Sequence, residues 1–369
     1  MRPTRAAIDL DAIASNYRFL RDRVGTHRAL LCVVKADAYG HGAGPVARRL
    51  EREGASRFAV AVAEEGIALR RAGIEGEVLL LNYSDPADIG THRAYGLVPA
   101  LYDLDQARAF AKVARDSREP LPVHVKLDTG MGRIGFRPEQ LEGIADLLRR
   151  SPGLSVAGTF SNLASAEDPR SPATAKQVEK LKAGVAALIA VGVSPGLVHL
   201  ANSAGILFHP DTWFDGVRPG LALYGISPAS DSGGAERLEP AMKLETRVMA
   251  VNEVPPGTAL GYGGRFVTER AAQIAVLPIG YHDGFRRSFS GRVRVLIRGS
   301  EASVVGAVNM DLTLVDATGI GARTGDPVVC LGTDGGRRVA AWDLARAADT
   351  VPYEILCGIG ARVPRTYGP

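Results

Sequence analysis

Two hydrophobic patterns, one typical of buried strands and one typical of helices, alternate eight times along the first 226 residues. Short apolar runs have the length and composition of buried β-strands. The segments between them, such as GPVARRLEREG and LDQARAFAKVARDS, carry apolar residues at helical spacing. This alternation predicts an α/β fold with an N-terminal (β/α)8 barrel of the TIM type. The predicted strands are residues 30–36, 58–63, 78–83, 97–102, 122–128, 155–161, 197–201 and 217–225.

Beyond residue 240 the pattern changes to short β-branched runs separated by Gly, Pro and Asp, which indicates a mostly β domain. One helix is expected at residues 341–348. The segment SPASDSGGAERLEP (227–240) between the two patterns is small and polar, and we interpret it as the domain boundary. The sequence therefore predicts a barrel domain over residues 1–230 and a C-terminal β domain over residues 238–369.

The composition is that of a globular enzyme, with 46% hydrophobic and 23% charged residues among 369. The net charge of +4 comes without any block of like charges, so nucleic-acid binding is not expected. Three distant cysteines without CxxC spacing suggest neither a metal site nor a disulfide framework. The N-terminus carries acids where a signal peptide needs an apolar stretch, and no apolar stretch is unbroken enough to span a membrane, so we expect a cytoplasmic protein.

The first predicted strand ends at a lysine. The apolar run LLCVVK passes there into ADAYGHG, so Lys35 is expected at the mouth of a buried strand. A lysine shielded from water can lose its proton and attack a carbonyl group. Four residues further on, the hydroxyl of Tyr39 could reach an anion such as a phosphate. The same residues would also suit a lysine that ends a strand in solvent, and their chemistry alone leaves both interpretations open.

HLANSAG (199–205) follows the seventh predicted strand and VRPGLALYG (217–225) forms the eighth, and both segments contain small residues. Phosphate sites in such barrels are often built from the loops after these two strands, where backbone N–H groups can approach an anion. The candidates here are Ser203, Gly220 and Leu221. His199 suits either a core histidine bonded to a neighbour or a member of the site.

Several of these segments resemble motifs of the alanine racemase family, in the family's order and spacing, from RPTRAAIDLDAIASNYR near the start to PYEILCGIGARVPR near the end. VVKADAYGHG (33–42) is similar to the segment whose lysine holds pyridoxal 5'-phosphate (PLP) as a Schiff base in that family. HVKLDTGMGRIGFR (124–137) resembles the DTGMGR element, and GYGGRF (261–266) resembles the SYG segment. The resemblance implies interconversion of L- and D-alanine by two bases, which supplies D-alanine for peptidoglycan, and a homodimer with a shared active site.

The resemblance also implies roles for single residues. The two catalytic bases would be Lys35 and Tyr262, and Arg218 would face the pyridine nitrogen of PLP. In many members the lysine that corresponds to Lys126 is carbamylated. Substrate contacts are implied for Arg133, Tyr281, Met310 and Asp311. Cofactor contacts are implied for Lys35, Tyr39, Asn162, His199, Asn202, Ser203, Arg218, Gly220, Leu221 and Tyr353.

Three positions depart from the family pattern. Asn162 stands where most members have a histidine that supports the pyridine-side arginine. Ala307 stands where an arginine is common, and His282 where an alanine is common. An asparagine can form hydrogen bonds but cannot titrate, so the departure at position 162 concerns the tuning of the cofactor ring.

The sequence is also compatible with other activities that use a similar barrel and lysine. A racemase of broad specificity, or one acting on serine or basic amino acids, would share the fold and the motifs. A non-catalytic PLP carrier shares a barrel and a lysine but has no second domain, and a PLP-dependent decarboxylase has different motifs. An aldolase that uses a barrel lysine without PLP would lack the visible absorbance of the cofactor.

Overall fold

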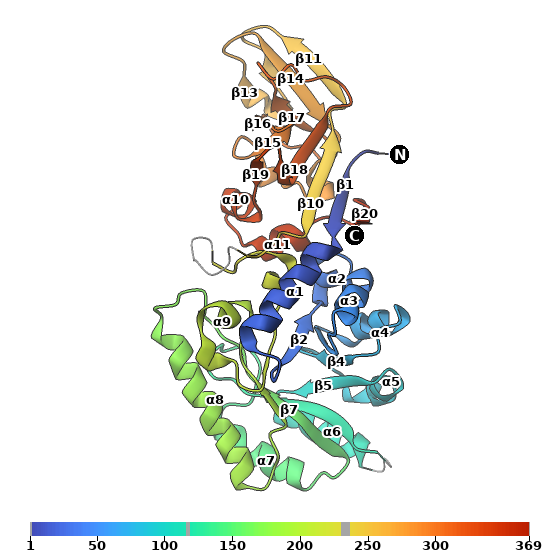
Figure 1. Cartoon of the computed structure of the whole chain (residues 1–369), viewed down its shortest axis with the longest axis vertical. Coiled ribbons are helices and arrows are strands. Elements are labelled where there is room, and N and C mark those ends of the chain that lie inside the picture. The colour runs from blue at the N-terminus through green and yellow to red at the C-terminus, as the bar shows by residue number, and fades with distance from the viewer. Residues whose placement is uncertain (1, 116–118, 230–236, 369) are drawn as a thin grey trace. The chain divides into compact units, whose positions relative to one another are not determined.

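The structure, a computed structural model, describes residues 2–115, 119–229 and 237–368 and consists of two compact units (Figure 1). The barrel unit comprises Ile13–Ala38 and Ala43–Glu239. The β unit comprises Met1–Ala12, Tyr39–Gly42 and Pro240–Pro369. The predicted boundary segment includes residues 230–236, which lie outside the described residues, and the two units divide between Glu239 and Pro240.

Eight parallel strands close into a barrel, which confirms the predicted fold. The pairing of β2 with β9, through Ala29 and Gly216, closes the ring. All five residues of β5 are buried, as expected for a parallel strand covered on both faces, and this burial explains why such strands are continuous apolar runs. The strands are β2 (Ala29–Val33), β3 (Arg57–Val60), β4 (Glu77–Leu80), β5 (Leu97–Leu101), β6 (Leu121–Lys126), β7 (Leu154–Phe160), β8 (Leu197–His199) and β9 (Gly216–Val217).

The eighth strand is shorter than predicted. β9 ends at Val217, and Leu221–Tyr224 form a 3-10 turn instead of continuing the strand. The carbonyl of Pro219 still accepts a hydrogen bond from Val33 N–H (2.9 Å), but Pro219 has no N–H group with which to continue the pairing. The residues of the 3-10 turn are nevertheless buried and apolar, and an apolar run of this kind is also what predicts a buried strand.

The helices that alternate with the barrel strands lie outside them (Figure 1). Phe110 of α6 and Ile144 of α7 pack in one buried cluster with Val123 and Val125 of β6. The side chain of Asp103 caps α6 by accepting hydrogen bonds from two backbone N–H groups of its first turn. The helices are α1 (Leu10–Val24), α2 (Lys35–Gly40), α3 (Ala43–Arg52), α4 (Ala63–Arg71), α5 (Ile89–Ala94), α6 (Leu104–Ala114), α7 (Leu141–Arg149), α8 (Pro172–Ala190) and α9 (Ser203–Phe208).

The β unit is built on a sheet whose strands run in the order β11-β14-β17-β16-β15-β18-β10-β1-β20, with β19 paired to β18. β12 and β13 form a separate hairpin. The strands are β1 (Arg5–Asp9), β10 (Met242–Arg247), β11 (Ala250–Val254), β12 (Ala259–Leu260), β13 (Phe266–Val267), β14 (Ala272–Leu277), β15 (Arg294–Ile297), β16 (Ser300–Val305), β17 (Thr313–Asp316), β18 (Pro327–Asp334), β19 (Arg337–Val339) and β20 (Arg365–Gly368).

The first strand of the chain belongs to this sheet and not to the barrel. β1 pairs antiparallel with β10, through Ala6 and Leu244, and parallel with β20, through Ala6 and Arg365. Ala6 and Ile8 are buried, and they alternate along the strand with more exposed residues. The first twelve residues, which the sequence analysis included in the barrel domain 1–230, are thus grouped with the β unit.

The β unit contains a second helix that the sequence did not reveal. The predicted helix is present as α10 (Ala341–Ala347), and α11 (Pro352–Cys357) follows within the closing segment. Within the described ranges no helix is long and apolar enough to cross a membrane. The same ranges contain no group of His, Cys, Asp and Glu side chains placed to hold a metal ion.

Candidate active site

The predicted residues of the barrel unit lie at or after the carboxyl ends of its strands, which meet at one end of a parallel barrel. Lys35 follows β2, Arg133 follows β6, and Arg218 comes directly after β9. The others are Asn162 after β7, His199 at the end of β8, Asn202 and Ser203 at the start of α9, and Gly220 and Leu221 after β9. The structure thus gathers these predicted residues at the barrel end where catalysis is expected.

Lys35 opens a left-handed helical turn. In α2 the four residues 36–39, none of them glycine, have φ between 51° and 54°. Each such residue costs about 1–2 kcal/mol, so the surroundings must hold the turn in place. The carboxylate of Glu65 accepts hydrogen bonds from the N–H groups of Ala36 (2.6 Å) and Ala61 (2.7 Å), and Ala38 donates its N–H to Val34 (2.9 Å). These bonds fix the backbone from which the Lys35 side chain projects.

Arg218 is buried, and both of its terminal nitrogens donate hydrogen bonds. Its Nη2 donates to the carbonyl oxygens of Ser161 (2.6 Å) and Leu200 (3.0 Å) and to Oδ1 of Asn162 (3.3 Å). Its Nη1 donates to Nδ1 of His199 (2.7 Å). Burial lowers the pKa of Arg218 to about 9, which is still above neutral pH, so the guanidinium stays charged. Asn162 therefore supports this arginine without being able to titrate.

Two neutral histidines continue this network. A guanidinium only donates, so Nδ1 of His199 accepts from Arg218, and its Nε2–H donates to Nδ1 of His124 (2.9 Å). Burial lowers the pKa of His199 well below its usual value and that of His124 to about 3. His199 thus uses both ring nitrogens inside the barrel, and it can influence a bound group only by orienting Arg218. His124 is a member of the site that the sequence did not indicate, because its alternating position in β6 looks like any core residue.

Lys126 lies in a cluster of positive charges. Burial lowers its pKa to about 7, and the charges of Arg218, Arg133 and Lys35 act in the same direction. Its Nζ donates to the carbonyl of Leu81 (3.1 Å) and lies 5.3 Å from the centre of the Phe160 ring. Arg218, Arg133 and Lys35 therefore place positive charge around Lys126, and an anion bound there would relieve the repulsion between these charges.

Asp128 shapes the loop that carries Arg133. Its carboxylate accepts hydrogen bonds from the N–H groups of Gly130 (3.0 Å) and Gly132 (3.1 Å). These bonds keep the pKa of Asp128 below its usual value although burial acts in the opposite direction. Gly132 has φ of 68°, which favours glycine there. The DTGMGR segment thus forms a tight turn whose last residue, Arg133, is exposed to solvent.

Ser203 joins the two loops predicted to hold a phosphate. Its Oγ accepts hydrogen bonds from the N–H groups of Gly220 (3.0 Å) and Ala222 (3.2 Å). Because the hydroxyl accepts twice, its own hydrogen remains available for a further acceptor. The side chain of Asn202 caps α9 by accepting from Gly205 N–H (3.0 Å). Asn202 therefore has a structural role in shaping this loop.

Four predicted residues of the β unit line one pocket. Tyr262, Tyr281, Met310 and Asp311 surround a cavity of about 580 Å³, together with Ala307 and Arg287. Three of them are unusually exposed for their type: Tyr262 to 75%, Met310 to 52% and Tyr281 to 41%. Large apolar side chains gathered at a concave surface commonly mark a site of binding.

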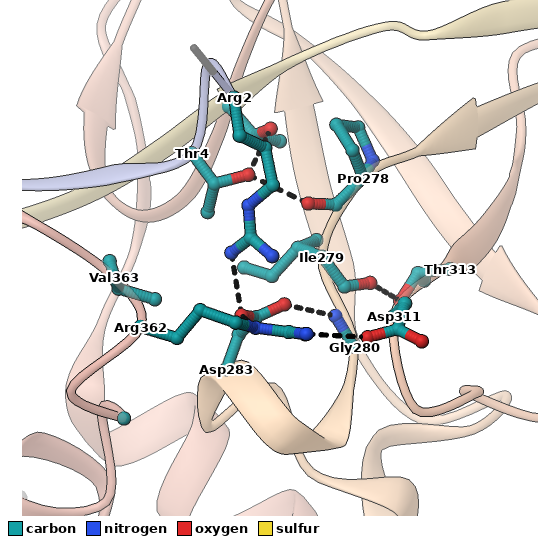
Figure 2. A network of polar contacts seen from close by, with 12 residues as sticks. Arg2, Thr4, Pro278, Ile279, Gly280, Asp283, Asp311, Thr313, Arg362 and Val363 are labelled. Carbon is teal, nitrogen blue, oxygen red and sulfur yellow. Dashed lines mark hydrogen bonds and ion pairs between the residues drawn. The ribbon is translucent and has the colours of Figure 1, made fainter.

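Asp311, which lines this pocket, forms an ion pair with an arginine. Its Oδ1 lies 2.7 Å from Nη1 of Arg362, and the same arginine donates from Nε to the buried carboxylate of Asp283 (2.8 Å) (Figure 2). Asp283 and Arg362 were not identified from the sequence, because an ion pair between residues 79 positions apart leaves no local pattern.

Tyr39 and Tyr353 lie together in the β unit, with their ring centres 5.7 Å apart. Burial raises the pKa of Tyr39 above its usual value, so its hydroxyl stays protonated and can donate a hydrogen bond. Gly40 packs against this region so closely that an added Cβ would lie 2.5 Å from the carbonyl oxygen of Leu356. The two tyrosines predicted at a phosphate are thus neighbours.

Two family models account for nearly the whole chain. The N-terminal domain of alanine racemase matches residues 8–228, and the C-terminal domain matches residues 241–367. The chain belongs to the alanine racemase family. As a member, it is an enzyme of the isomerase class, an amino-acid racemase, and its barrel followed by a β unit is the arrangement of solved alanine racemases.

Known proteins resemble this racemase over their full length. An alanine racemase of Symbiobacterium thermophilum is 43% identical over 369 residues, which is 100% of this chain and 98% of the relative. The crystal structure of an alanine racemase from D-cycloserine-producing Streptomyces lavendulae has a TM-score of 0.96 at 35% identity and covers 100% of this chain and 98% of its own. That of Bartonella henselae, described with covalently bound pyridoxal phosphate, has a TM-score of 0.91 at 29% identity and covers 100% of both chains.

We expect the neutral pair of His124 and His199 to destabilise the racemase as the solution is acidified. An unfolded chain protonates each histidine near pH 6.5, whereas the folded protein keeps His124 neutral to about pH 3. Between these values the unfolded state binds more protons, so the free energy of unfolding falls by up to about 1.4 kcal/mol per pH unit for each histidine. The variant His124→Gln should show a shallower slope between pH 6.5 and 5 in urea denaturation. An unchanged slope would contradict the assignment, and the exposed His27→Gln serves as the matched control.

Proposed function

We propose that this racemase interconverts L- and D-alanine with PLP bound at the barrel end, and that it supplies D-alanine for cell-wall peptidoglycan. The observation that carries the proposal is the positive charge of Lys35, Arg133 and Arg218, which together act to lower the pKa of Lys126 at this end of the barrel. A phosphorylated, phenolic cofactor and a carboxylate substrate are anions that such a cluster suits. The curated relatives of the same length are named alanine racemases, which supports the choice of substrate.

The residues present fit PLP. Lys35 would hold it covalently, and the free hydroxyl hydrogen of Ser203 and the protonated hydroxyl of Tyr39 would donate to its phosphate. Gly220, Leu221 and Tyr353 are also proposed to hold the cofactor. Asn162 and His199 would act on it through Arg218, and Asn202 would act through the loop that it caps. When bound, PLP withdraws electrons from the amino acid and makes its Cα hydrogen acidic.

Arg218 would restrict that chemistry to racemisation. Its guanidinium keeps its proton at neutral pH, and its bonds to His199, Asn162 and two carbonyl groups hold it in one orientation. Facing the pyridine nitrogen, it would leave that atom unprotonated and the ring a weaker electron acceptor. A weaker acceptor favours return of a proton to Cα over decarboxylation or transamination.

Two bases on opposite faces of the substrate would move the Cα proton. Lys35 would serve one face and Tyr262 the other, each removing a proton from one enantiomer and returning one to form the other. The exposed Arg133 would hold the substrate carboxylate, and Met310 and Asp311 would lie beside it. Tyr281 would narrow the entrance.

Lys126 is chemically suited to become a carbamate. With a pKa of about 7, its amine is neutral in a large fraction of molecules at neutral pH. A neutral amine can attack the carbon of CO2 and lose a proton to water, which leaves a carboxylate on the nitrogen. We propose that this modification occurs and that the new negative charge holds Arg133 in place.

The substrate is tested by polarimetry on a panel of alanine, serine, arginine and lysine. We expect alanine to be racemised with the highest kcat/KM, because the curated relatives are alanine racemases. Equal rates for serine or the basic amino acids would indicate a racemase of broad specificity. Cofactor binding without turnover of any of them would indicate a non-catalytic PLP-binding protein.

The cofactor anchor is tested by Lys35→Ala. This variant should lose both racemisation and the visible absorbance of covalently bound PLP. The exposed Lys112→Ala on α6 is the matched control and should keep both. If borohydride reduction and mass spectrometry still find PLP bound to the Lys35→Ala chain, another lysine is the anchor.

The second base is tested by Tyr262→Phe. Removal of the hydroxyl should slow proton transfer on one face of the substrate far more than on the other. In deuterated water, the incorporation of deuterium into recovered substrate should then differ between L- and D-alanine. Equal incorporation from both enantiomers would remove Tyr262 from the mechanism.

The active site is proposed to be shared between the two chains of a head-to-tail homodimer, with Tyr262 and Met310 serving the partner's Lys35. We expect activity when Lys35→Ala and Tyr262→Phe chains are mixed under conditions of subunit exchange. With random pairing, half of the dimers are mixed and each regains one of two sites, so activity should reach about a quarter of wild type. If exchange is confirmed and no activity returns, both bases act within one chain.

A further inference from the structure

A buried carboxylate in the β unit is held by two arginines that are far apart in the sequence. The side chain of Asp283 is fully buried. Its Oδ1 lies 2.5 Å from Nη2 of Arg2 and 2.8 Å from Nε of Arg362 (Figure 2). Its Oδ2 accepts a hydrogen bond from Gly280 N–H (3.0 Å). Burial acts to raise the pKa of Asp283, but the bonds from Arg362 and Arg2 outweigh it and hold that pKa below its usual value.

The turn that contains Asp283 is attached to the loop that carries Met310. The N–H of Tyr281 donates to the carbonyl of Asn309 (2.9 Å), and that of His282 donates to the carbonyl of Met310 (3.1 Å). A Cβ added at Gly280 would lie 2.3 Å from the carbonyl oxygen of Asn309, so the two backbones are in tight contact. Both segments line the pocket of the β unit.

The charges of this network balance in pairs. Two carboxylates, Asp283 and Asp311, face two guanidinium groups, Arg2 and Arg362, and Arg362 contacts both carboxylates. If Arg2 were absent, Arg362 alone would have to neutralise the buried Asp283. A buried charge left without a partner is costly, so Arg362 would be drawn toward Asp283 and would hold the exposed Asp311 less firmly.

The start of the chain is fixed beside this network. Thr4 donates its hydroxyl to the carbonyl of Pro278 (2.7 Å) and shares a second hydrogen bond with the hydroxyl of Thr246 (2.9 Å). β1 then continues into the sheet between β10 and β20. Arg2 therefore approaches Asp283 from an anchored backbone.

We propose that Arg2 is a positioning residue for the substrate. Acting through Asp283 and Arg362, it holds Asp311, Met310 and Tyr281 in the arrangement that lines the pocket of the β unit. The inference rests on the proposed function for its effect on alanine, since those three side chains are the ones proposed to contact the substrate or its entrance. Arg2 itself does not line the pocket.

The test compares Arg2→Ala with Arg5→Ala in the full-length holoenzyme. Arg5 is a matched control, because it also lies in the first residues of the chain and pairs with an acid, but this acid is Glu245 of β10, which does not line the pocket. For Arg2→Ala we expect KM for alanine to rise about fivefold with kcat within about a factor of two, the pattern of lost substrate positioning. Arg2→Lys should recover part of the affinity, and Arg5→Ala should keep the wild-type KM. A lower melting temperature with an unchanged KM in Arg2→Ala would show a purely structural role and overturn the proposal.

A second measurement does not depend on turnover. Hydrogen exchange at the N–H groups of Tyr281 and His282 reports whether their bonds to the Met310 loop open. These amides should exchange several times faster in Arg2→Ala than in Arg5→Ala or wild type. Equal exchange in all three proteins would overturn the positioning role of Arg2. A wild type that is inactive on alanine would reject the proposed function, but the exchange experiment would still test this inference.

Discussion

The buried guanidinium of Arg218 is the interaction on which the catalytic end of the barrel depends. It bonds to groups that follow β7 and β8 while its own backbone follows β9, and through His199 it reaches His124 on β6. Taking such a charge out of water costs several kcal/mol, and each charge-assisted hydrogen bond returns about 1.5–3 kcal/mol. Because the charge is stable only while all these acceptors stay in place, the ends of four neighbouring strands are fixed relative to one another.

The left-handed turn after β2 is the second constraint at this end of the barrel. Its four residues with positive φ are held by Glu65, whose carboxylate bridges the segments after β2 and β3. Lys35 precedes the turn, so its backbone is oriented by bonds made on the barrel itself. Arg218 and this turn thus fix two of the segments that follow the barrel strands, one after β9 and one after β2.

The sequence predicted those parts of the molecule that leave a local pattern. Buried parallel strands are continuous apolar runs, so all eight barrel strands could be located, and residues at strand ends such as Lys35 and Arg218 followed from them. β1 was missed because RAAID is short, and the partners that identify it as a strand lie more than two hundred residues away. The left-handed turn was invisible because Ala, Asp and Tyr do not signal positive φ as glycine does. The pairs Arg2 with Asp283 and His124 with His199, which are 281 and 75 positions apart, exist only through tertiary structure.

The position of β1 also constrains the order in which the two units can form during synthesis. Apart from four residues, the barrel unit is built from the continuous stretch 13–239, so its contacts become possible once that stretch has been made. The pairing partners of β1 are synthesised later, because β10 follows the barrel in the sequence and β20 lies at residues 365–368. An unpaired strand that waits for a distant partner is slow to fold and prone to wrong pairing. The pairing of β1 with β20 therefore cannot form until residues 365–368 have been made, long after the contacts within residues 13–239 have become possible.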